Sequence, residues 1–141
     1  MAEQKKPTME ELKAIAGKKK KEEVLEIDRT VIKRYAEAIG DPDPKWKDVA
    51  PPGLLTAAML TGGFPALGIP LPFKRGVAAG GDWEFYKPIK AGDIITTTHE
   101  FAEIQDKSSE KGPRALLIFK STHKNQKGEV VAVSTNTLMS Y

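Results

Sequence analysis

The stretch GGDWEFYKPIKAGD, residues 80–93, decides the fold. Aromatic and polar residues alternate from Asp82 to Lys87, and a period of two predicts a β-strand with one buried face. Pro88 restricts the backbone, whereas Gly92 tolerates left-handed angles, and this combination is typical of a tight turn. The stretch therefore predicts a half-buried strand that ends in a turn.

The chain after this turn consists of β-prone segments joined by hairpin loops. Branched and aromatic residues fill these segments, and such residues pack well on the pleated surface of a sheet. The two connections, DKSSEKGP and NQKG, are rich in the residues that tight turns require. Together with the strand in the opening stretch, they predict four antiparallel strands. The three segments are IITTTHEFAEIQ (94–105), RALLIFKSTHK (114–124) and EVVAVSTNTLMSY (129–141).

The first half of the chain predicts a short strand followed by a helix. EVLEID (23–28) suits a strand, and Asp28 or Thr30 can cap a helix because the side-chain oxygen accepts from a free backbone N–H. The apolar positions of residues 31–39 repeat at the spacing of a helix. Gly40 suits the left-handed angles that end one.

A second helix is expected in APPGLLTAAMLTGG (50–63), from Leu54 to Thr61. It is apolar nearly all round, which is typical of a buried helix. The next segment, FPALGIPLPFKRGVAAGG (64–81), is rich in proline and glycine yet strongly apolar, so we expect a loop that lies over a cleft or against a partner. A helix that covers one face of an antiparallel sheet predicts an α+β fold.

The length of 141 residues fits one domain with a real core. Residues 1–20 are polar and rich in lysine, so we expect a flexible extension before a single domain over residues 21–141. The lysines of residues 18–21 stand beside Glu22 and Glu23, with no aromatic residue among them to stack on bases. This mixed charge favours a solvated segment over nucleic-acid binding.

The composition excludes several classes of site. The chain has no cysteine, which excludes disulfides, thiolate nucleophiles and cysteine-ligated metals. No apolar run approaches the roughly 20 residues that span a membrane, and the charged N-terminus is unlike a signal peptide. We therefore expect a cytoplasmic protein with no metal, no cofactor and no membrane partner.

Four stretches of the chain form a recognisable set in their order and spacing. They are EIDRTVIKRYAEAIGDPDP (26–44), APPGLL (50–55), GGDWEFYKPIKAGD (80–93) and NQKGEVVAVSTNTLM (125–139). Together they resemble the MaoC-like dehydratase/hydratase family, and in particular its N-terminal-type, non-catalytic domain, over about residues 23–141. The resemblance implies a hot-dog fold, in which an antiparallel sheet wraps around a buried helix. It also implies hydration of trans-2-enoyl thioesters, or the reverse dehydration.

Active members of that family carry a motif similar to G-D-x-N-P-x-H, in which the aspartate and the histidine together activate water. Gly40, Asp41 and Pro44 match this motif. Asp43 stands in the place of the asparagine, and Trp46 stands in the place of the histidine. Indole has no basic nitrogen, so it cannot transfer protons near neutral pH as histidine does. The resemblance therefore implies a degenerate hydratase motif and no catalytic residue in this chain.

The other polar residues offer no evident replacement base. His99 and His123 each fall inside a predicted strand, where contact with solvent or with a sheet neighbour is the expected role. Asp41 and Asp43 precede prolines in GDPDP, so we interpret them as turn residues rather than as a metal site or a dyad. Trp46 has two open interpretations: a core aromatic residue, or a ring that fills the volume of a lost active site.

The resemblance implies the silent half of a unit of two hot-dog domains. We expect a non-catalytic subunit of a heteromeric enoyl-CoA (enoyl-thioester) hydratase or dehydratase that acts in fatty-acid or steroid side-chain metabolism. Its partners would be a catalytic MaoC-like subunit and an acyl-CoA or acyl carrier protein thioester. By analogy alone, a zinc-ribbon/OB-fold protein and a thiolase are further partners. The residues expected to shape the acyl pocket are Leu54, Leu55, Met59 and Phe64.

Two alternatives stay open. The first is a homodimeric hot-dog protein that binds acyl-CoA without catalysing a reaction. The second is an active enzyme in which Asp41 works with another base in place of the missing histidine of the motif.

Overall fold

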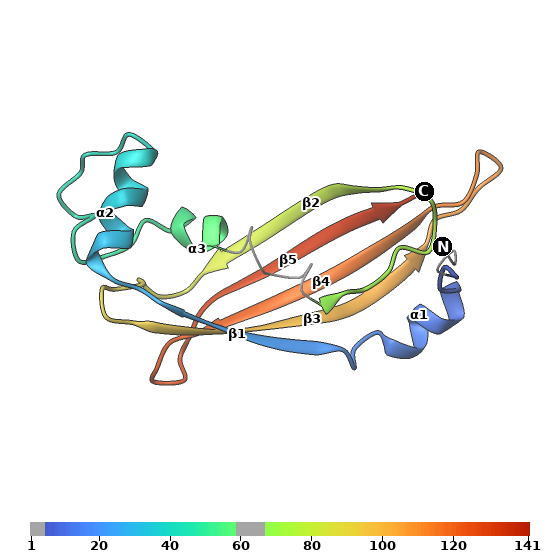
Figure 1. Cartoon of the computed structure of the whole chain (residues 1–141), viewed down its shortest axis with the longest axis horizontal. Coiled ribbons are helices and arrows are strands. Elements are labelled where there is room, and N and C mark those ends of the chain that lie inside the picture. Colours follow the sequence, from blue (N-terminus) through green and yellow to red (C-terminus); the bar gives the residue numbers. More distant parts are fainter. Residues whose placement is uncertain (1–4, 59–66) are drawn as a thin grey trace.

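The computed structural model describes residues 5–58 and 67–141. Its described part is built around one five-stranded antiparallel sheet with the strand order β1-β3-β4-β5-β2, so β1 and β2 form the two edges (Figure 1). This sheet, together with its helices, confirms the predicted α+β class. In chain order the elements are α1 (Met9–Ile15), β1 (Lys20–Glu26), α2 (Arg29–Ala38), α3 (Gly53–Ala58), β2 (Gly76–Phe85), β3 (Ile94–Asp106), β4 (Ala115–Lys124) and β5 (Val130–Ser140).

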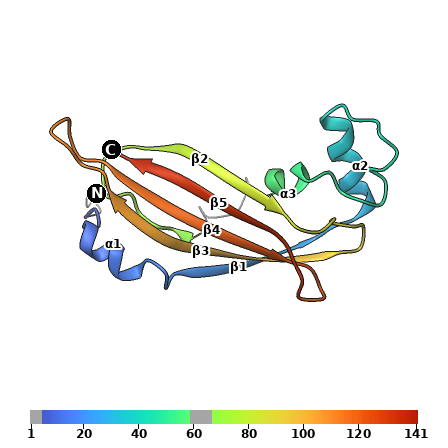
Figure 2. The ribbon, with the colours of Figure 1, turned by 180° about the vertical axis from the view of Figure 1, so that it is seen from behind.

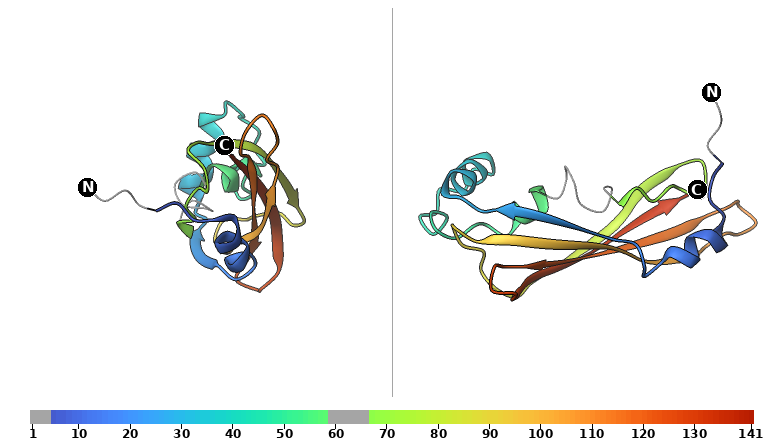
Figure 3. Two further views of the ribbon diagram at one scale, coloured as in Figure 1. Left: turned by 90° about the vertical axis from the view of Figure 1, so that its right-hand side faces the viewer. Right: turned by 60° about the horizontal axis from the view of Figure 1, so that its bottom comes forward.

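The core lies on the side of the curved sheet that carries α2 and α3 (Figure 3). Alternate residues along β3 and β4 are buried, whereas most of the residues between them are only partly covered. Leu54 and Leu55 of α3 are buried in one cluster with Ile95 and Val131 of the sheet. The prediction of a buried helix is therefore confirmed for Leu54 and Leu55, whereas Thr56 on the same helix is exposed. None of the helices in the described ranges is long and apolar enough to cross a membrane.

Part of the N-terminal extension is packed against the sheet. The helix α1 begins after Thr8, whose side chain accepts a hydrogen bond from the Glu11 backbone N–H at 3.1 Å. Leu12 of this helix is 1% exposed and belongs to a second cluster with Phe101 and Leu117. Figure 2 shows α1 and α2 at opposite ends of the sheet. The domain boundary after residue 20 stays a prediction, but the packed region includes α1.

The strand β2 begins earlier than the sequence predicts. The prediction of a loop over residues 64–81 is wrong from Gly76 onward, because Gly76 already lies opposite Ser140 in the antiparallel pair with β5. Glycine and alanine have low intrinsic preference for strands, and pairing with a neighbouring strand overrides that preference. Residues 64–66 of the expected loop and 59–61 of the expected second helix lie outside the described residues.

Candidate functional site

The degenerate motif occupies the loop that follows α2. Asp28 caps the helix, since its side chain accepts a hydrogen bond from the Val31 backbone N–H at 2.7 Å. The chain leaves the helix at Gly40, whose φ of 69° is the left-handed conformation that the sequence predicts there. The next N–H, that of Asp41, donates to the Ala36 carbonyl at 3.0 Å. The start of the loop, and with it the Asp41 backbone, is therefore fixed at the helix end.

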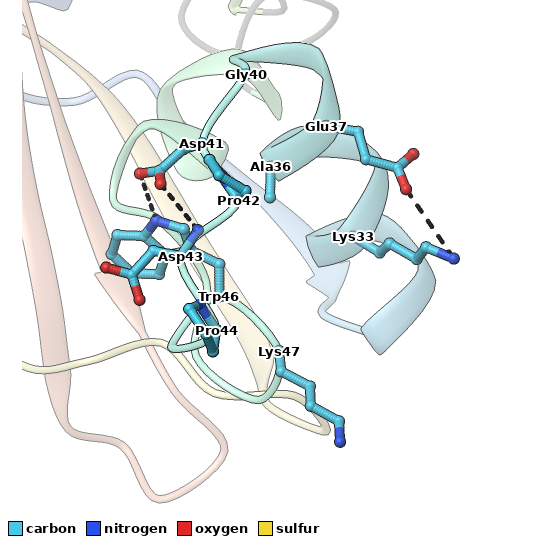
Figure 4. Close-up of a pocket in the computed structure, with 10 residues that line it drawn as sticks. All are labelled: Lys33, Ala36, Glu37, Gly40, Asp41, Pro42, Asp43, Pro44, Trp46 and Lys47. Carbon is cyan, nitrogen blue, oxygen red and sulfur yellow. Dashed lines mark hydrogen bonds and ion pairs between the residues drawn. The ribbon is translucent and has the colours of Figure 1, made fainter.

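Two N–H groups of the loop hold the carboxylate of Asp41 (Figure 4). The indole Nε1–H of Trp46 donates to Asp41 Oδ2 at 2.7 Å, and the Asp43 backbone N–H donates to Oδ1 at 3.1 Å. Hydrogen bonds to the ionised form favour it, so the indole contact first and the backbone contact second hold the pKa of Asp41 below its ordinary value. At neutral pH Asp41 is an anion fixed to an indole.

The indole of Trp46 is fixed by the same loop. The Nζ atom of Lys45 lies 4.5 Å from the ring centroid and 3.6 Å from Asp43 Oδ2. The backbone N–H of Lys45 donates to Asp43 Oδ1 at 3.0 Å. Asp41 and Asp43 thus each accept a hydrogen bond from the backbone N–H two residues further on. This is the usual geometry of aspartate in a turn, which agrees with the interpretation of GDPDP as a turn sequence.

A cleft of about 520 Å³ lies between α2 and this loop (Figure 4). One wall belongs to the helix, where Lys33 and Glu37 form an ion pair at 4.0 Å. The other wall belongs to the loop and includes the ring of Trp46. A volume of this size lies within the range of small-molecule sites. The lining residues are Lys33, Ala36, Glu37, Gly40, Asp41, Pro42, Asp43, Pro44, Trp46 and Lys47.

The indole of Trp46 can neither take up nor supply a proton near neutral pH, so it cannot do the work of a histidine in a hydration. Addition of water to a conjugated thioester needs a base that takes a proton from water and an acid that protonates the α-carbon. The indole N–H only donates, and its hydrogen bond to Asp41 makes that carboxylate a weaker base than usual. Across residues 5–58 and 67–141, no group of three histidine, aspartate or glutamate side chains could hold a metal ion.

Both histidines lie in the sheet and contact neighbouring strands. His99 Nε2 lies 3.0 Å from Glu23 Oε2, and His99 Nδ1 lies 2.7 Å from Ser121 Oγ. His123 Nδ1 lies 2.7 Å from Thr97 Oγ1. These partners belong to β1, β3 and β4, so the expected role of a strand histidine that contacts a sheet neighbour is confirmed for both.

These contacts belong to a row of buried polar side chains across the sheet, which we call the buried polar row and which the sequence did not predict. Its members are Thr97, His99, Ser121, His123 and Ser134. His123 also lies 3.4 Å from Ser134 Oγ, and its ring stacks on Trp83 with a centroid distance of 5.0 Å. Burial lowers the pKa of His123 to about 4, with a smaller contribution from nearby His99. The sequence does contain one sign that His99 is buried, namely the period of two along β3. His99 falls on the same alternating positions as Ile95, and these positions are buried.

The residues expected to shape an acyl pocket lie in the core, as far as the structure describes them. Leu54 and Leu55 are 6% and 1% exposed, and both pack in the cluster that contains Ile32. Neither lines the cleft beside Trp46. Met59 and Phe64 lie outside the described residues. A role for these four residues in an acyl pocket stays a prediction.

Gly53 begins α3 directly against the side chain of Tyr35. A Cβ atom at position 53 would overlap the Tyr35 hydroxyl, and Tyr35 packs against the core cluster. We expect Gly53→Ala to lower the free energy of unfolding by about 1–2 kcal/mol, as overpacking does. Thermal unfolding measures the effect. Gly80→Ala is the matched control, because a Cβ atom there meets nothing within 4 Å. Equal melting temperatures for the two variants would contradict this account of Gly53.

One family matches the chain over most of its length. The family described as FAS1-like, dehydratase domain region matches residues 14–134. The chain is also similar to the UPF0336 protein of Thermobifida fusca (strain YX). The two are 26% identical over an alignment of 132 positions, and the match covers 83% of this chain and 84% of that protein.

Three solved structures share the fold and confirm the hot-dog architecture. The MaoC-like dehydratase from Rhodospirillum rubrum has a TM-score of 0.65 at 22% identity, over 86% of this chain and 90% of that chain. The HadBC (3R-hydroxyacyl-ACP dehydratase) complex from Mycobacterium tuberculosis has a TM-score of 0.63 at 18% identity, over 83% of this chain and 90% of that chain. The ChsH1-ChsH2 complex from the same organism has a TM-score of 0.65 at 17% identity, over 92% of this chain and 86% of that chain.

Proposed function

This chain belongs to the FAS1-like, dehydratase domain region family, and we propose that within it the chain is a non-catalytic subunit of a heteromeric enoyl-thioester hydratase or dehydratase. The hydrogen bond from the Trp46 indole to Asp41 carries the proposal. It supports the proposal because the indole N–H can only donate, whereas the histidine that the resemblance implies at this position in active members acts as a base. The scaffold of the motif is kept while the proton-transfer step is lost.

The comparisons support a heteromeric assembly. The HadBC complex is a 3R-hydroxyacyl-ACP dehydratase with two named components, and the ChsH1-ChsH2 structure is also a complex of two named proteins. We propose that the partner of this chain is a hot-dog subunit that supplies the aspartate and the histidine. The thioester substrate would carry CoA or an acyl carrier protein. A thiolase and a zinc-ribbon/OB-fold protein stay further candidate partners by analogy alone.

The division of labour has a physical motive. A subunit without proton-transfer groups is free to use its surface for substrate shape and assembly, because no catalytic geometry must be kept within tenths of an ångström. We propose that this chain helps to enclose the acyl part of the substrate, with Leu54, Leu55, Met59 and Phe64 as its candidate residues.

A second candidate is a homodimer that binds acyl-CoA without turnover. The cleft beside Trp46 favours it, since that cleft is large enough for part of a small ligand and does not need a catalytic base. The two candidates differ in one measurable property. The subunit requires a different chain for its function, whereas the homodimer binds acyl-CoA alone.

Replacement of Asp41 tests whether the motif is silent. We expect Asp41→Asn to leave the hydratase turnover of the assembled complex within about twofold of wild type, because Asp41 is engaged with Trp46 and is not needed as a base. A general base at this position would make the same variant slower by about 100-fold or more. Steady-state hydration of a trans-2-enoyl-CoA by the co-purified complex measures the difference.

The control for this test is the partner's own aspartate. Its change to asparagine in the same complex has to abolish turnover, which shows that the assay reports the chemical step. A large loss of turnover with Asp41→Asn and an unchanged complex would contradict the silent-subunit proposal.

A further inference from the structure

One face of the sheet is left open by the described helices. Leu12 of α1, Ile32 of α2 and Leu54 of α3 all belong to the core clusters, which also contain the alternate buried positions of β3 and β4. The end-on view shows the three helices on the same side of the sheet (Figure 3, left). We call the opposite side of the sheet the outer face.

Four strand ends form a row at one end of the sheet. The Lys107 backbone N–H, just after β3, donates to the Arg114 carbonyl, just before β4, at 2.8 Å. The Arg75 N–H donates to the main-chain oxygen of Tyr141 at 2.8 Å, and the Tyr141 N–H donates back to the Arg75 carbonyl at 2.9 Å. We call these four residues the basic row, because three of them are cations.

The side chains of the basic row project from the outer face. In the neighbouring row, Asp106 stands opposite Ala115, which stands opposite Ser140. Ala115 and Ser140 are both buried, so this neighbouring row faces the core. Successive side chains of a strand point to opposite faces, and the basic row is one residue further on in each case.

The basic row departs from the usual pairing of charges between strands. Lys107 and Arg114 stand opposite each other, and like charges in that position destabilise a sheet. Another row of the outer face follows the usual pattern. There Glu100 stands opposite both Lys20 and Lys120, and it pairs with Lys20 at 3.7 Å. A local conflict of charge that the fold retains is expected where a surface has a function.

No carboxylate in the described ranges neutralises the basic row. Lys107, Arg114 and Arg75 are exposed, and none of them takes part in an ion pair among residues 5–58 and 67–141. Asp106, the nearest acid along the chain, belongs to the core-facing row, and its Oδ1 accepts a hydrogen bond from the Ser108 backbone N–H at 2.9 Å. The three cations are therefore available to carboxylates of another molecule.

An apolar row lies beside the basic row on the outer face. Leu116 of β4 stands opposite Met139 of β5, which stands opposite Val77 of β2. Leu116 and Met139 are partly exposed, and Val77 is 44% exposed. Tyr141 adds a ring that is 40% exposed to the same end of the face. Cations next to exposed apolar side chains complement a surface that presents carboxylates next to apolar residues.

The form of this surface favours a protein as its occupant. Small ligands bind in concave sites, and neither the cleft beside Trp46 nor the other described clefts include residues of the two rows. Nucleic acid is bound by cations that follow the phosphates and by aromatic residues that stack on bases. Here the row next to the cations is aliphatic, which offers nothing to a phosphate backbone.

We propose that the basic row and the apolar row together dock an acidic surface of another protein. Carboxylates of that partner pair with Lys107, Arg114 and Arg75, and its apolar side chains pack on Leu116 and Met139. The surface lies at the end of the sheet where the loop between β3 and β4 projects (Figure 1). The inference goes beyond the proposed function, because neither row contains a residue of the hydratase motif or of the expected acyl pocket.

Photo-crosslinking from the apolar row tests the inference. A benzophenone amino acid replaces Leu116 in the full chain, the source cells that produce this chain are irradiated before lysis, and the cross-linked peptide is identified by mass spectrometry. We expect a peptide of another protein in which aspartate or glutamate residues flank apolar residues. The matched control carries the same amino acid at Thr122, which lies on the same strand and face, is also partly exposed, and belongs to neither row.

Charge reversal provides a second readout. We expect Lys107→Glu combined with Arg114→Glu to lower the yield of the Leu116 cross-link about tenfold or more, because two attractions become repulsions. Lys120→Glu combined with Lys124→Glu is the control, since it changes the net charge equally on the same face, and its yield should stay within about twofold of the unreversed chain. Added salt tests the same attraction without substitution, and we expect it to lower the yield from Leu116.

Several results would overturn the inference. They are a yield from Leu116 no higher than from Thr122, a cross-linked peptide without acidic residues, and a cross-link to nucleic acid, to lipid or to a second copy of this chain. An equal loss of yield in the two charge-reversed variants, or a yield that salt does not change, would also contradict it. Each of these results leaves the silent-subunit proposal standing, because that proposal depends on a catalytic partner and not on the basic row.

Discussion

Leu12→Ala is expected to lower the free energy of unfolding by about 3 kcal/mol, which is within the usual range for a leucine removed from a core. Leu12 is 1% exposed, although it lies in a lysine-rich segment that the sequence alone assigns to a flexible extension. Its neighbours in the second cluster include Phe101 and Leu117. Removal of the side chain leaves a cavity between α1 and the sheet, and urea unfolding measures the loss.

Lys13→Ala is the matched control for this prediction. Its side chain is 50% exposed and forms an ion pair with the exposed Glu10 at 3.5 Å, so the change should stay within about 0.5 kcal/mol. If Leu12→Ala were no more destabilising than Lys13→Ala, α1 would not be part of the folded core in solution.

The second large effect is a loss of stability in mild acid. Burial holds the pKa of His123 at about 4, against an ordinary value of 6.5. Between these two values the unfolded chain binds a proton at this residue and the folded chain does not. The contribution of His123 to the free energy of unfolding is therefore fully present above about pH 7. It is lost as the pH drops from 6.5 toward 4, by about 3 kcal/mol in total.

Urea unfolding at a series of pH values measures this slope, and His123→Gln is the variant for comparison. Glutamine keeps a donor and an acceptor for Thr97 and Ser134 but does not titrate. We expect a flatter slope between pH 6.5 and 4.5 for the variant. The lowered pKa values of Asp41, Asp106 and Glu129 affect stability mainly below pH 4.5, since their ordinary values are 3.8, 3.8 and 4.5, and His123→Gln changes none of these residues. An unchanged slope in His123→Gln would contradict the assignment.

Local features of the fold were predictable because their causes are local. Alternation in the stretch 80–93 and turn residues at Pro88 and Gly92 predict the end of β2 and the turn after it. The expected buried face of this strand is wrong, because Trp83 is only partly buried and Phe85 is 40% exposed at the edge of the sheet. Asp28 caps the start of α2 by accepting a hydrogen bond from the backbone N–H three residues later. Gly40 takes the left-handed backbone conformation just after the end of the same helix. In each case the residues that decide the conformation stand next to it in the chain.

Features that depend on distant pairing were not predictable. The strand character of Gly76 comes from Ser140 opposite it, and no property of a glycine-rich segment indicates that partner. The buried polar row depends on register in the same way, because His123 lies opposite Thr97 only when β3 and β4 pair as they do. The packing of Leu12 depends on Phe101, far along the chain.

The candidate site shows the same division. The sequence predicts that Asp41 and Trp46 share one loop and that the histidine of the motif is absent. It does not predict the hydrogen bond of 2.7 Å by which the Trp46 indole holds the Asp41 carboxylate. Nor does it predict the groove of about 330 Å³ that Trp46, Phe85 and Tyr86 help to line, because its walls come from two segments far apart in the chain.

We propose that this chain works as the silent subunit of a hydratase made of two different chains. The decisive experiment is a native pull-down from the source cells, with mass spectrometry of the proteins that co-purify. We expect a stoichiometric hot-dog partner that carries both the aspartate and the histidine of the hydratase motif. Recovery of the chain with only itself, or hydratase turnover by the purified chain alone, would contradict it.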